Sequence, residues 1–403
     1  MKKAISLILS LLILTAICAV NASALEAEGF TYTEDNGKAV ITGYTGSDTN
    51  LVIPATLNGL KVEEIEDNAF YQNHNITSVT IENGIEEIGD KAFYNCTGLT
   101  KVTIPDSVTD IGDSAFSYCV YLTDVTLGKG IDEISNNCFS HDTRLESIVI
   151  PEGVTELDDG AFEECTHLKN VSLPTTLNTI GDYAFAYTYS LAEITLPENL
   201  ETISEGAFYF NSALTSVTFP ESMRYLSHYA FYANSALTTV ELNEGLYTMG
   251  DMAFDGTAIQ SLYIPSTIVT MGSHPFGFIY NEETFEYELN PGFMALCVEG
   301  SFGAQICQAH GIACTFVPVK TNTPETTAKP IETTANNSSA TSPYNKGDVN
   351  FDTHVDEIDT DDIQHHLAYL KMLSEKAEAL ADYDSNGKVN IKDNVQIQKA
   401  MAK

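Results

Sequence analysis

The chain has 403 residues, with 19 basic against 56 acidic side chains and a formal net charge of −37. A surface this acidic repels nucleic-acid phosphates and anionic lipids, so neither a nucleic acid nor a membrane surface is the expected partner. No segment after the N-terminus approaches the roughly 20 consecutive apolar residues of a bilayer-spanning helix, so we expect no membrane span.

The N-terminus has the pattern of a secretory signal peptide. Lys2 and Lys3 precede an apolar stretch over residues 4–20, and small residues at positions 22–24 form a site for signal peptidase. A basic start, a short apolar stretch and a small-residue cleavage site are typical of this class. We therefore expect residues 1–24 to be removed and the rest of the chain to be secreted.

Phenylalanine recurs with a fixed period through the middle of the chain. Nine phenylalanines stand 23 residues apart and a tenth follows one residue early: Phe70, Phe93, Phe116, Phe139, Phe162, Phe185, Phe208, Phe231, Phe254 and Phe276. A constant period of about 20 to 29 residues is typical of a leucine-rich-repeat solenoid. In such a fold one coil cannot bury its apolar face alone, and stacked coils form a continuous core.

One repeat illustrates the predicted coil. Val102 and Ile104 alternate as the inward side chains of a strand, and Pro105 ends it because proline cannot donate to a ladder. Asp113 stands where it would cap a short helical turn that carries Phe116 inward. Each coil is therefore predicted to have one strand, two turns and one short return segment.

The repeats resemble the BspA-type leucine-rich repeat, from about residue 29 to residue 317. The resemblance implies a solenoid domain over residues 25–319, with a parallel β-strand and a short helix or turn in each 23-residue repeat. The segment 278–288, rich in aromatic and acidic residues, is expected to form an inserted hairpin near its end.

Both ends of the repeat region also resemble the family. The segment that begins Phe30-Thr-Tyr-Thr is similar to the N-terminal cap, at about residues 29–60. The segment that begins at Gly300 is similar to the closing helix and strand, within about residues 292–317. The resemblance therefore implies a capped solenoid.

The cysteines fall into two groups. Seven follow the signal peptide: Cys96, Cys119, Cys138, Cys165, Cys297, Cys307 and Cys314. Three of the first four lie three residues after a repeat phenylalanine, where other repeats have asparagine or threonine, and the fourth replaces an alanine. Small, weakly polar, buried side chains explain these four. The chain has no CxxC pair and no HExxH motif, so zinc is not suggested, and the disulfide state of the last three stays open.

Two columns on the repeat are candidates for chemistry. An acidic column lies three residues before the phenylalanines: Asp90, Asp113, Asp159, Asp182, Glu205 and Asp251, interrupted by Asn136 and His228. Neighbouring carboxylates could bind calcium or act as acid and base, but capping explains the column without a ligand. An aromatic set follows the phenylalanines: Tyr71, Tyr94, Tyr118, Tyr187, Tyr209, Phe210 and Tyr232. Its rings either stack on sugars or pack at the solenoid edge.

The outward face of the predicted strands is the candidate binding surface. Its distinctive side chains are Lys101, Asp124, Asn170, Glu193, Glu241 and Tyr263, set among serines and threonines. Solenoids use such an extended face for partners, and small polar side chains form no deep pocket. We expect a protein ligand, or a glycan.

Residues 320–345 change to threonine, proline, serine and asparagine. Apolar residues are too sparse there to offset the entropy of ordering, so we predict a flexible linker and a site for O-glycosylation.

Two loops after the linker offer oxygen ligands at alternate positions. The predicted calcium ligands are Asp348, Asn350, Asp352, His354, Asp356 and Asp359 in the first loop, and Asp382, Asp384, Asn386, Lys388, Asn390 and Asp393 in the second, where His354 and Lys388 offer backbone carbonyls. Such spacing suits Ca²⁺, which takes six to eight oxygens. Gly387 permits the sharp turn in the second loop, while Phe351 and Thr353 stand where glycines are usual in the first. We predict two Ca²⁺ ions, the first bound more weakly.

Residues 346–403 resemble a type I-like dockerin, a small all-α calcium-binding module, with one helix after each loop at about 361–373 and 392–402. The resemblance implies binding to a cohesin module of a scaffolding protein. The implied cohesin contacts are Glu357, Ile358, Gln364 and His365 in one half, and Ile391, Lys392, Gln398 and Lys399 in the other. Because the halves differ in charge, we predict one preferred binding orientation.

These features predict a secreted, non-catalytic binding protein, docked into a cellulosome-like complex and associated with polysaccharide catabolism. A surface adhesin would use the same solenoid. A glycoside hydrolase is a further alternative, which would need two carboxylates across a cleft, about 5 to 9.5 Å apart.

Overall fold

The computed structural model describes residues 25–272, 274–281 and 286–320. The chain divides into two compact units, residues 1–320 and 321–403. The predicted signal peptide at 1–24, the linker from residue 321, and the dockerin-like module with all its predicted calcium and cohesin positions lie outside the described residues. Within the described part, no helix is both long and apolar enough to cross a bilayer.

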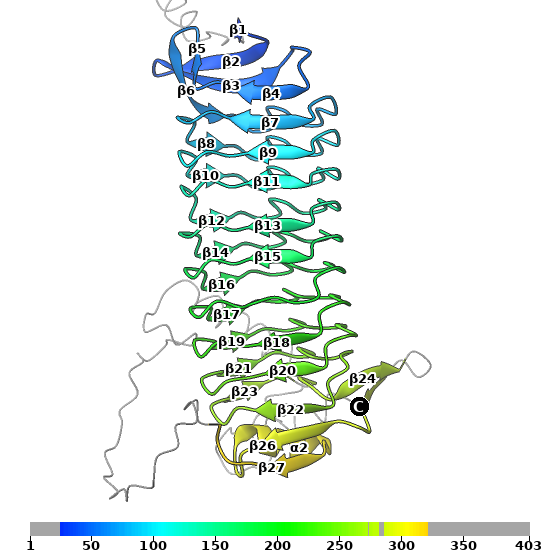
Figure 1. Cartoon of the computed structure of the whole chain (residues 1–403). Coiled ribbons are helices and arrows are strands. Elements are labelled where there is room, and N and C mark those ends of the chain that lie inside the picture. The colour runs from blue at the N-terminus through cyan, green and yellow to red at the C-terminus, as the bar shows by residue number, and fades with distance from the viewer. Residues whose placement is uncertain (1–24, 273, 282–285, 321–403) are drawn as a thin grey trace, which may run out of the picture. The chain divides into compact units, whose positions relative to one another are not determined.

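The repeats fold into stacked coils whose strands form two columns (Figure 1). The long-strand column contains β4 (Asn50–Ile53), β7 (Ser78–Ile81), β9 (Lys101–Thr103), β11 (Asp124–Thr126), β13 (Ser147–Val149), β15 (Asn170–Ser172), β18 (Ser216–Thr218), β20 (Thr239–Glu241), β22 (Ser261–Ile264), β26 (Met294–Cys297) and β27 (Cys314–Phe316). The paired strands within it are parallel, and the bridge between Glu193 and Ser216 marks the coil before β18.

The short-strand column contains β8 (Glu87–Ile88), β10 (Asp110–Ile111), β12 (Glu133–Ile134), β14 (Glu156–Leu157), β16 (Thr179–Ile180), β17 (Thr202–Ile203), β19 (Tyr225–Leu226), β21 (Thr248–Met249) and β23 (Thr270–Met271). Paired residues are 23 apart, as in Glu156 with Thr179, until Thr248 pairs with Thr270 at 22. The early position of Phe276 reflects this shortened coil.

The coils contain a strand that was not predicted. We expected one strand and a short helix or turn, whereas each coil also has a second, two-residue strand, and its return is made of turns instead of a helix. Ser114 (φ 57°) and Tyr118 (φ 61°) take left-handed backbone angles on either side of Phe116, which a helix does not allow. Among the described residues the one α-helix is α2 (Phe302–His310), beyond the repeats.

The repeat phenylalanines form one continuous stack in the core. From Phe70 to Phe254 successive ring centroids are 4.7 to 5.6 Å apart, and neighbouring rings lie within 15° of parallel. All of these rings are buried. The stack confirms the predicted solenoid core.

A cap that contains both antiparallel and parallel strand pairs precedes the coils. Its strands are β1 (Leu25–Ala27), β2 (Phe30–Asp35), β3 (Lys38–Tyr44), β5 (Thr56–Leu57) and β6 (Leu60–Ile65). Asn58 (φ 50°) and Gly59 (φ 85°) make the two-residue turn between β5 and β6, because a hairpin turn of this kind needs two left-handed residues. Strand β6 then pairs in parallel with β8 and starts the short-strand column.

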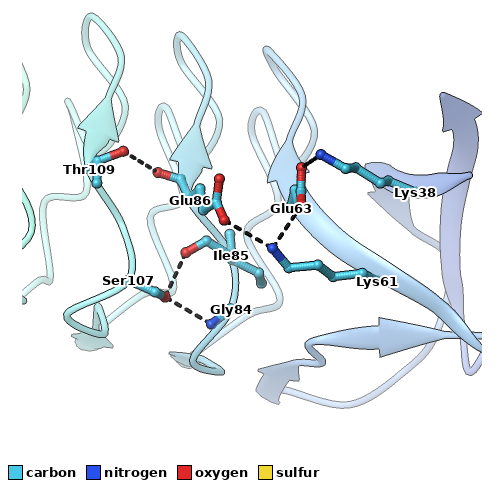
Figure 2. Close-up of polar contacts among 8 residues, drawn as sticks. All are labelled: Lys38, Lys61, Glu63, Gly84, Ile85, Glu86, Ser107 and Thr109. Atoms are coloured by element: carbon cyan, nitrogen blue, oxygen red, sulfur yellow. Dashed lines mark hydrogen bonds and ion pairs between the residues drawn. The ribbon is translucent and has the colours of Figure 1, made fainter. Parts of the chain in front are cut away.

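Charged side chains tie this cap to the first coil (Figure 2). Lys38 and Lys61 both pair with Glu63, and Lys61 also reaches Glu86 at 2.9 Å. One coil further, the Ser107 hydroxyl donates to the carbonyl of Ile85 at 2.7 Å. Side chains thus supplement the strand pairing between layers.

The end of the solenoid follows the predicted order. Strands β24 (Phe278–Asn281) and β25 (Glu286–Leu289) form the inserted antiparallel hairpin. Strand β26, helix α2 and strand β27 then close the stack. The Ser301 hydroxyl caps α2 by accepting the backbone N–H of Ala304 at 3.3 Å, and Gly311 (φ 71°) ends it.

Candidate binding faces of the solenoid

The strand face is the outward surface of the long-strand column. It exposes five of the six predicted ligand-contact residues: Lys101, Asp124, Asn170, Glu193 and Glu241. They lie on β9, β11, β15 and β20 and in the coil before β18. Parallel strands about 4.8 Å apart hold them in different layers of one surface.

Tyr263, the sixth predicted residue, is buried, so its expected exposure is wrong. Its side chain is 6% exposed because Lys320, 57 residues later, lies against it. The backbone N–H of Lys320 donates to the Tyr263 hydroxyl at 3.0 Å, and the Lys320 ammonium lies 4.9 Å from the ring centroid. Burial, together with the hydrogen bond that the hydroxyl donates to Glu244, raises the pKa of Tyr263 to about 12.

The strand face is polar, and its charges pair with one another. Lys101 Nζ lies 2.6 Å from the Asp124 carboxylate, and both side chains are about half exposed. Beside the strands, threonine hydroxyls bond to the preceding coil, as Thr100 does to the carbonyl of Thr77 at 2.9 Å. Val149, 67% exposed, is an apolar side chain in this surface. A second exposed apolar side chain is Val52 on β4, which is 53% exposed, so the face offers hydrogen bonds, charges and apolar contacts.

An aromatic row lies along the return turns of the first coils. Tyr71, Tyr94, Tyr118 and His141 follow one another with ring centroids 5.2, 5.4 and 4.1 Å apart. They line a shallow hollow of about 470 Å³ together with polar side chains: Asn68, Lys91, Ser114, Ser117, Asn137 and Ser140. Aromatic rings mixed with hydrogen-bonding groups can accept a ligand that is apolar on its faces and polar at its edges.

The aromatic row ends at a contact between a histidine ring and a carboxylate. His141 Nδ1 lies 3.0 Å from the Glu164 carboxylate of the next coil. A second aromatic group begins at Tyr187, whose ring is 5.5 Å from Tyr209 and 5.7 Å from Phe210. Its members pack mainly on each other, in agreement with the edge-packing alternative.

The acidic column three residues before each phenylalanine links neighbouring coils. Asp90 Oδ1 accepts the backbone N–H of Asp113 at 2.9 Å, and Asp182 Oδ1 accepts that of Glu205 at 2.8 Å. The predicted cap within one coil is wrong, because Asp113 instead accepts a hydrogen bond from Asn136 of the next coil at 3.2 Å. These bonds account for the column as a structural ladder.

A second acidic column, which sequence analysis missed, lies on the short-strand column. Its members share the 23-residue period: Glu64, Glu87, Asp110, Glu133 and Glu156. Burial first, and then the charge of Glu133, raises the pKa of Glu156, and the pKa of nearby Asp158 rises to about 6 for similar reasons. The repeat period was the signal for this column, which makes that side of the solenoid strongly negative.

Buried cysteines occupy the position three residues after the phenylalanine, as predicted. Cys96 Sγ donates to the carbonyl of Phe70 at 3.1 Å. Asn234 Nδ2 makes the same contact to Phe208 at 2.7 Å, which explains why thiol and amide share this position. Burial raises the pKa of the Cys96 thiol to about 12, so it is a poor nucleophile at neutral pH.

Asp142 holds the same position in its own coil and was missed. It is 0% exposed, and neither carboxylate oxygen has a hydrogen-bond partner among the described residues. Burial holds the pKa of Asp142 well above its usual range, and the backbone N–H of Cys119, which is nearby but not in hydrogen-bonding geometry, lowers it only in part. Inspection of the position three after Phe139 would have found an acid in a column of cysteine, asparagine and threonine.

A family model described as BspA type leucine rich repeat region matches residues 63–188 and 156–281. Similar crystal structures include a leucine rich cell surface protein from Faecalibacterium prausnitzii, 26% identical over 68% of this chain and 88% of that chain, with a TM-score of 0.39. A leucine-rich repeat protein from Bacteroides ovatus is 20% identical over 73% of this chain and 100% of that chain, with a TM-score of 0.39. No curated protein matches the chain.

Proposed function

Because the chain belongs to the BspA-type leucine-rich repeat family, we propose that it is a secreted, non-catalytic binding protein that holds a protein ligand on its strand face. The observation that carries this proposal is the exposure of Lys101, Asp124, Asn170, Glu193 and Glu241 along one surface of the stacked coils. An extended face suits a macromolecule better than a small molecule, which needs a concave site.

A charge reversal on the strand face tests the proposal. The immobilised full chain is exposed to extracellular proteins from its own organism, and retained proteins are identified by mass spectrometry. Lys101→Glu should lower retention of the ligand at least tenfold, while Lys129→Glu, the same change on an exposed turn, should leave it unchanged. A ligand retained equally by both variants would place the binding site elsewhere.

A glycan ligand is the second candidate, and the hollow along the aromatic row favours it. Tyr94→Ala removes a ring from the middle of this row. Tyr121→Ala is its control, since Tyr121 is exposed but stacks with Arg144, outside the row. Loss of binding to an immobilised polysaccharide in the first variant only is the expected result, and equal binding by both would remove this candidate.

The proposal extends to residues 346–403, which would attach the solenoid to a cohesin module in a cellulosome-like complex. Its support is the resemblance to a dockerin and the two loops of alternating oxygen ligands, placed 34 residues apart in the chain. In a calcium titration of the full chain, Asp384→Ala should remove the tighter site and Asp352→Ala the weaker one. Two equal sites would contradict the predicted difference, and cohesin binding that survives chelation would contradict the docking role.

Two readouts separate the alternatives. A ligand from a host-cell surface, with no attachment to a scaffold, favours an adhesin. Hydrolysis of cellulose or xylan by the full chain favours a glycoside hydrolase. The ladder between coils that occupies Asp90, Asp182 and their counterparts supports the non-catalytic role, since these carboxylates already accept backbone hydrogen bonds.

A further inference from the structure

Three cysteines from separate segments meet at the closing end of the solenoid. Cys297 ends β26, Cys307 lies in α2, and Cys314 begins β27. Their sulfur atoms all lie within 4.8 Å of one another, and Sγ of Cys297 is 3.7 Å from Sγ of Cys307. Cys297 and Cys307 are buried, and Cys314 is partly exposed. We call these residues the thiol cluster.

The fold around the thiol cluster determines where its sulfurs lie. Ala295 on β26 pairs with Cys314 on β27, and paired residues in neighbouring strands share a face of the sheet. Cys297 lies two residues after Ala295 and therefore points to the same face as Ala295 and Cys314. Helix α2 lies close to the preceding coils at Gly303, where an added Cβ would stand 2.4 Å from Ile264. The helix therefore holds Cys307 against the strands.

The thiol cluster differs from the other cysteines. Cys96, Cys119 and Cys165 each donate to a main-chain carbonyl, so their repeat position explains them. Cys138 stands where other repeats have alanine. By contrast, the sulfurs of Cys297 and Cys307 face each other, which packing alone does not require.

The sulfur separations suit a thiophilic cation. A tetrahedral zinc ion with Zn–S bonds of about 2.3 Å holds its sulfurs about 3.8 Å apart, close to the separation of Cys297 and Cys307. A disulfide needs an S–S distance of about 2.05 Å and would leave the third thiol unused. Cys314 can approach the other two because it lies on the last strand of its sheet and is partly exposed.

We propose that Cys297, Cys307 and Cys314 bind one zinc-class cation, with solvent as the fourth ligand on the exposed side of Cys314. The three thiols lose their protons to solvent as the metal–sulfur bonds form. The cation links β26, α2 and β27, so it stabilises the segment from which residues 317–320 leave the solenoid. This site is independent of the ligand-binding faces.

Cobalt substitution tests the site in the full chain. The protein is reduced, stripped of metal, saturated with Ca²⁺ to occupy oxygen sites, and titrated with Co²⁺. We expect sulfur-to-cobalt charge-transfer absorption that saturates at one equivalent and disappears when Zn²⁺ is added. Zinc should also raise the midpoint of thermal unfolding.

Variants tie the absorption to the thiol cluster. Cys314→Ser, at the partly exposed position, should weaken cobalt binding at least tenfold without unfolding the chain, and Cys307→Ala should abolish the absorption. Cys138→Ala, which removes a buried thiol outside the cluster, should leave it intact. The proposal is overturned by absent thiolate absorption in the reduced protein, by absorption that survives both cluster variants, or by a Cys297–Cys307 disulfide in the protein as purified.

Discussion

The inside and the outside of the coils share one period but differ in how strictly they keep it. Inside, phenylalanine recurs in every coil from Phe70 to Phe254, and each ring packs on the next. Outside, the strand-face position changes from Lys101 to Asp124, then to a serine, and then to Asn170. The difference reflects what each side contacts: an inner side chain must fit its own copies above and below, whereas an outer one meets solvent or a ligand.

Asp142 is an interior exception to this comparison. Asp142 replaces the cysteine, asparagine or threonine that other coils place beside the core, and it is buried without a hydrogen-bond partner for its carboxylate. An unsatisfied acid in a core reduces stability, whereas an acid on the strand face does not. Stability and binding should therefore respond to different columns of the repeat.

The largest loss of stability is expected when an interior phenylalanine is replaced by alanine. Phe162→Ala leaves a cavity between Phe139 and Phe185, whose ring centroids lie 5.6 and 5.4 Å from that of Phe162. Losing a buried ring costs about 3–5 kcal/mol of unfolding free energy, measured by chemical denaturation. Phe316→Ala is the control, since Phe316 is 60% exposed and its loss should cost far less. Equal losses would mean that the phenylalanine stack does not dominate the core.

A smaller change, and a gain in stability instead of a loss, is expected from Asp142→Asn. An asparagine there can donate to the Phe116 carbonyl, as Asn234 does to Phe208. Replacing the unsatisfied carboxylate by a bonded amide should raise the unfolding free energy at pH 8 by about 1–3 kcal/mol.

The pH dependence identifies the cause of that effect. Because burial raises the pKa of Asp142 above its unfolded value, the folded chain keeps a proton that the unfolded chain has released. The contribution of Asp142 to stability therefore falls as pH rises from the unfolded pKa towards the folded pKa. The advantage of Asp142→Asn should grow from pH 4 to pH 8. An advantage that is constant over this range would rule out titration of Asp142 as its source.

The sequence predicted the buried positions of the solenoid more accurately than the exposed ones. The phenylalanine period predicted the stack and the solenoid, since a core position is dictated by neighbours at known spacing. It missed the burial of Tyr263, because Lys320 comes from 57 residues further along the chain. It also did not predict the thiol cluster, because Cys297, Cys307 and Cys314 have no CxxC spacing and meet only when α2 folds back. These particular contacts lie outside the repeat period, so the period could not predict them.

The smallest effect on stability is expected on the strand face. Lys101→Ala removes the ion pair with Asp124, which is short at 2.6 Å but joins two side chains that are about half exposed. Water and salt screen such pairs, and holding two long side chains in one geometry costs entropy, so exposed pairs contribute about 0–1 kcal/mol. Lys101→Ala should thus change the unfolding free energy by less than about 0.5 kcal/mol, as denaturation would measure.

The same variant should alter ligand association, which separates binding from folding. If the strand face holds the ligand, loss of Lys101 should change the association rate and its dependence on ionic strength, because surface charges steer encounters. Stopped-flow association at low and high salt measures this, with Lys129→Ala as the control on an exposed turn. A large loss of stability in Lys101→Ala would break the division between interior and exterior, since an outer position would then support the fold.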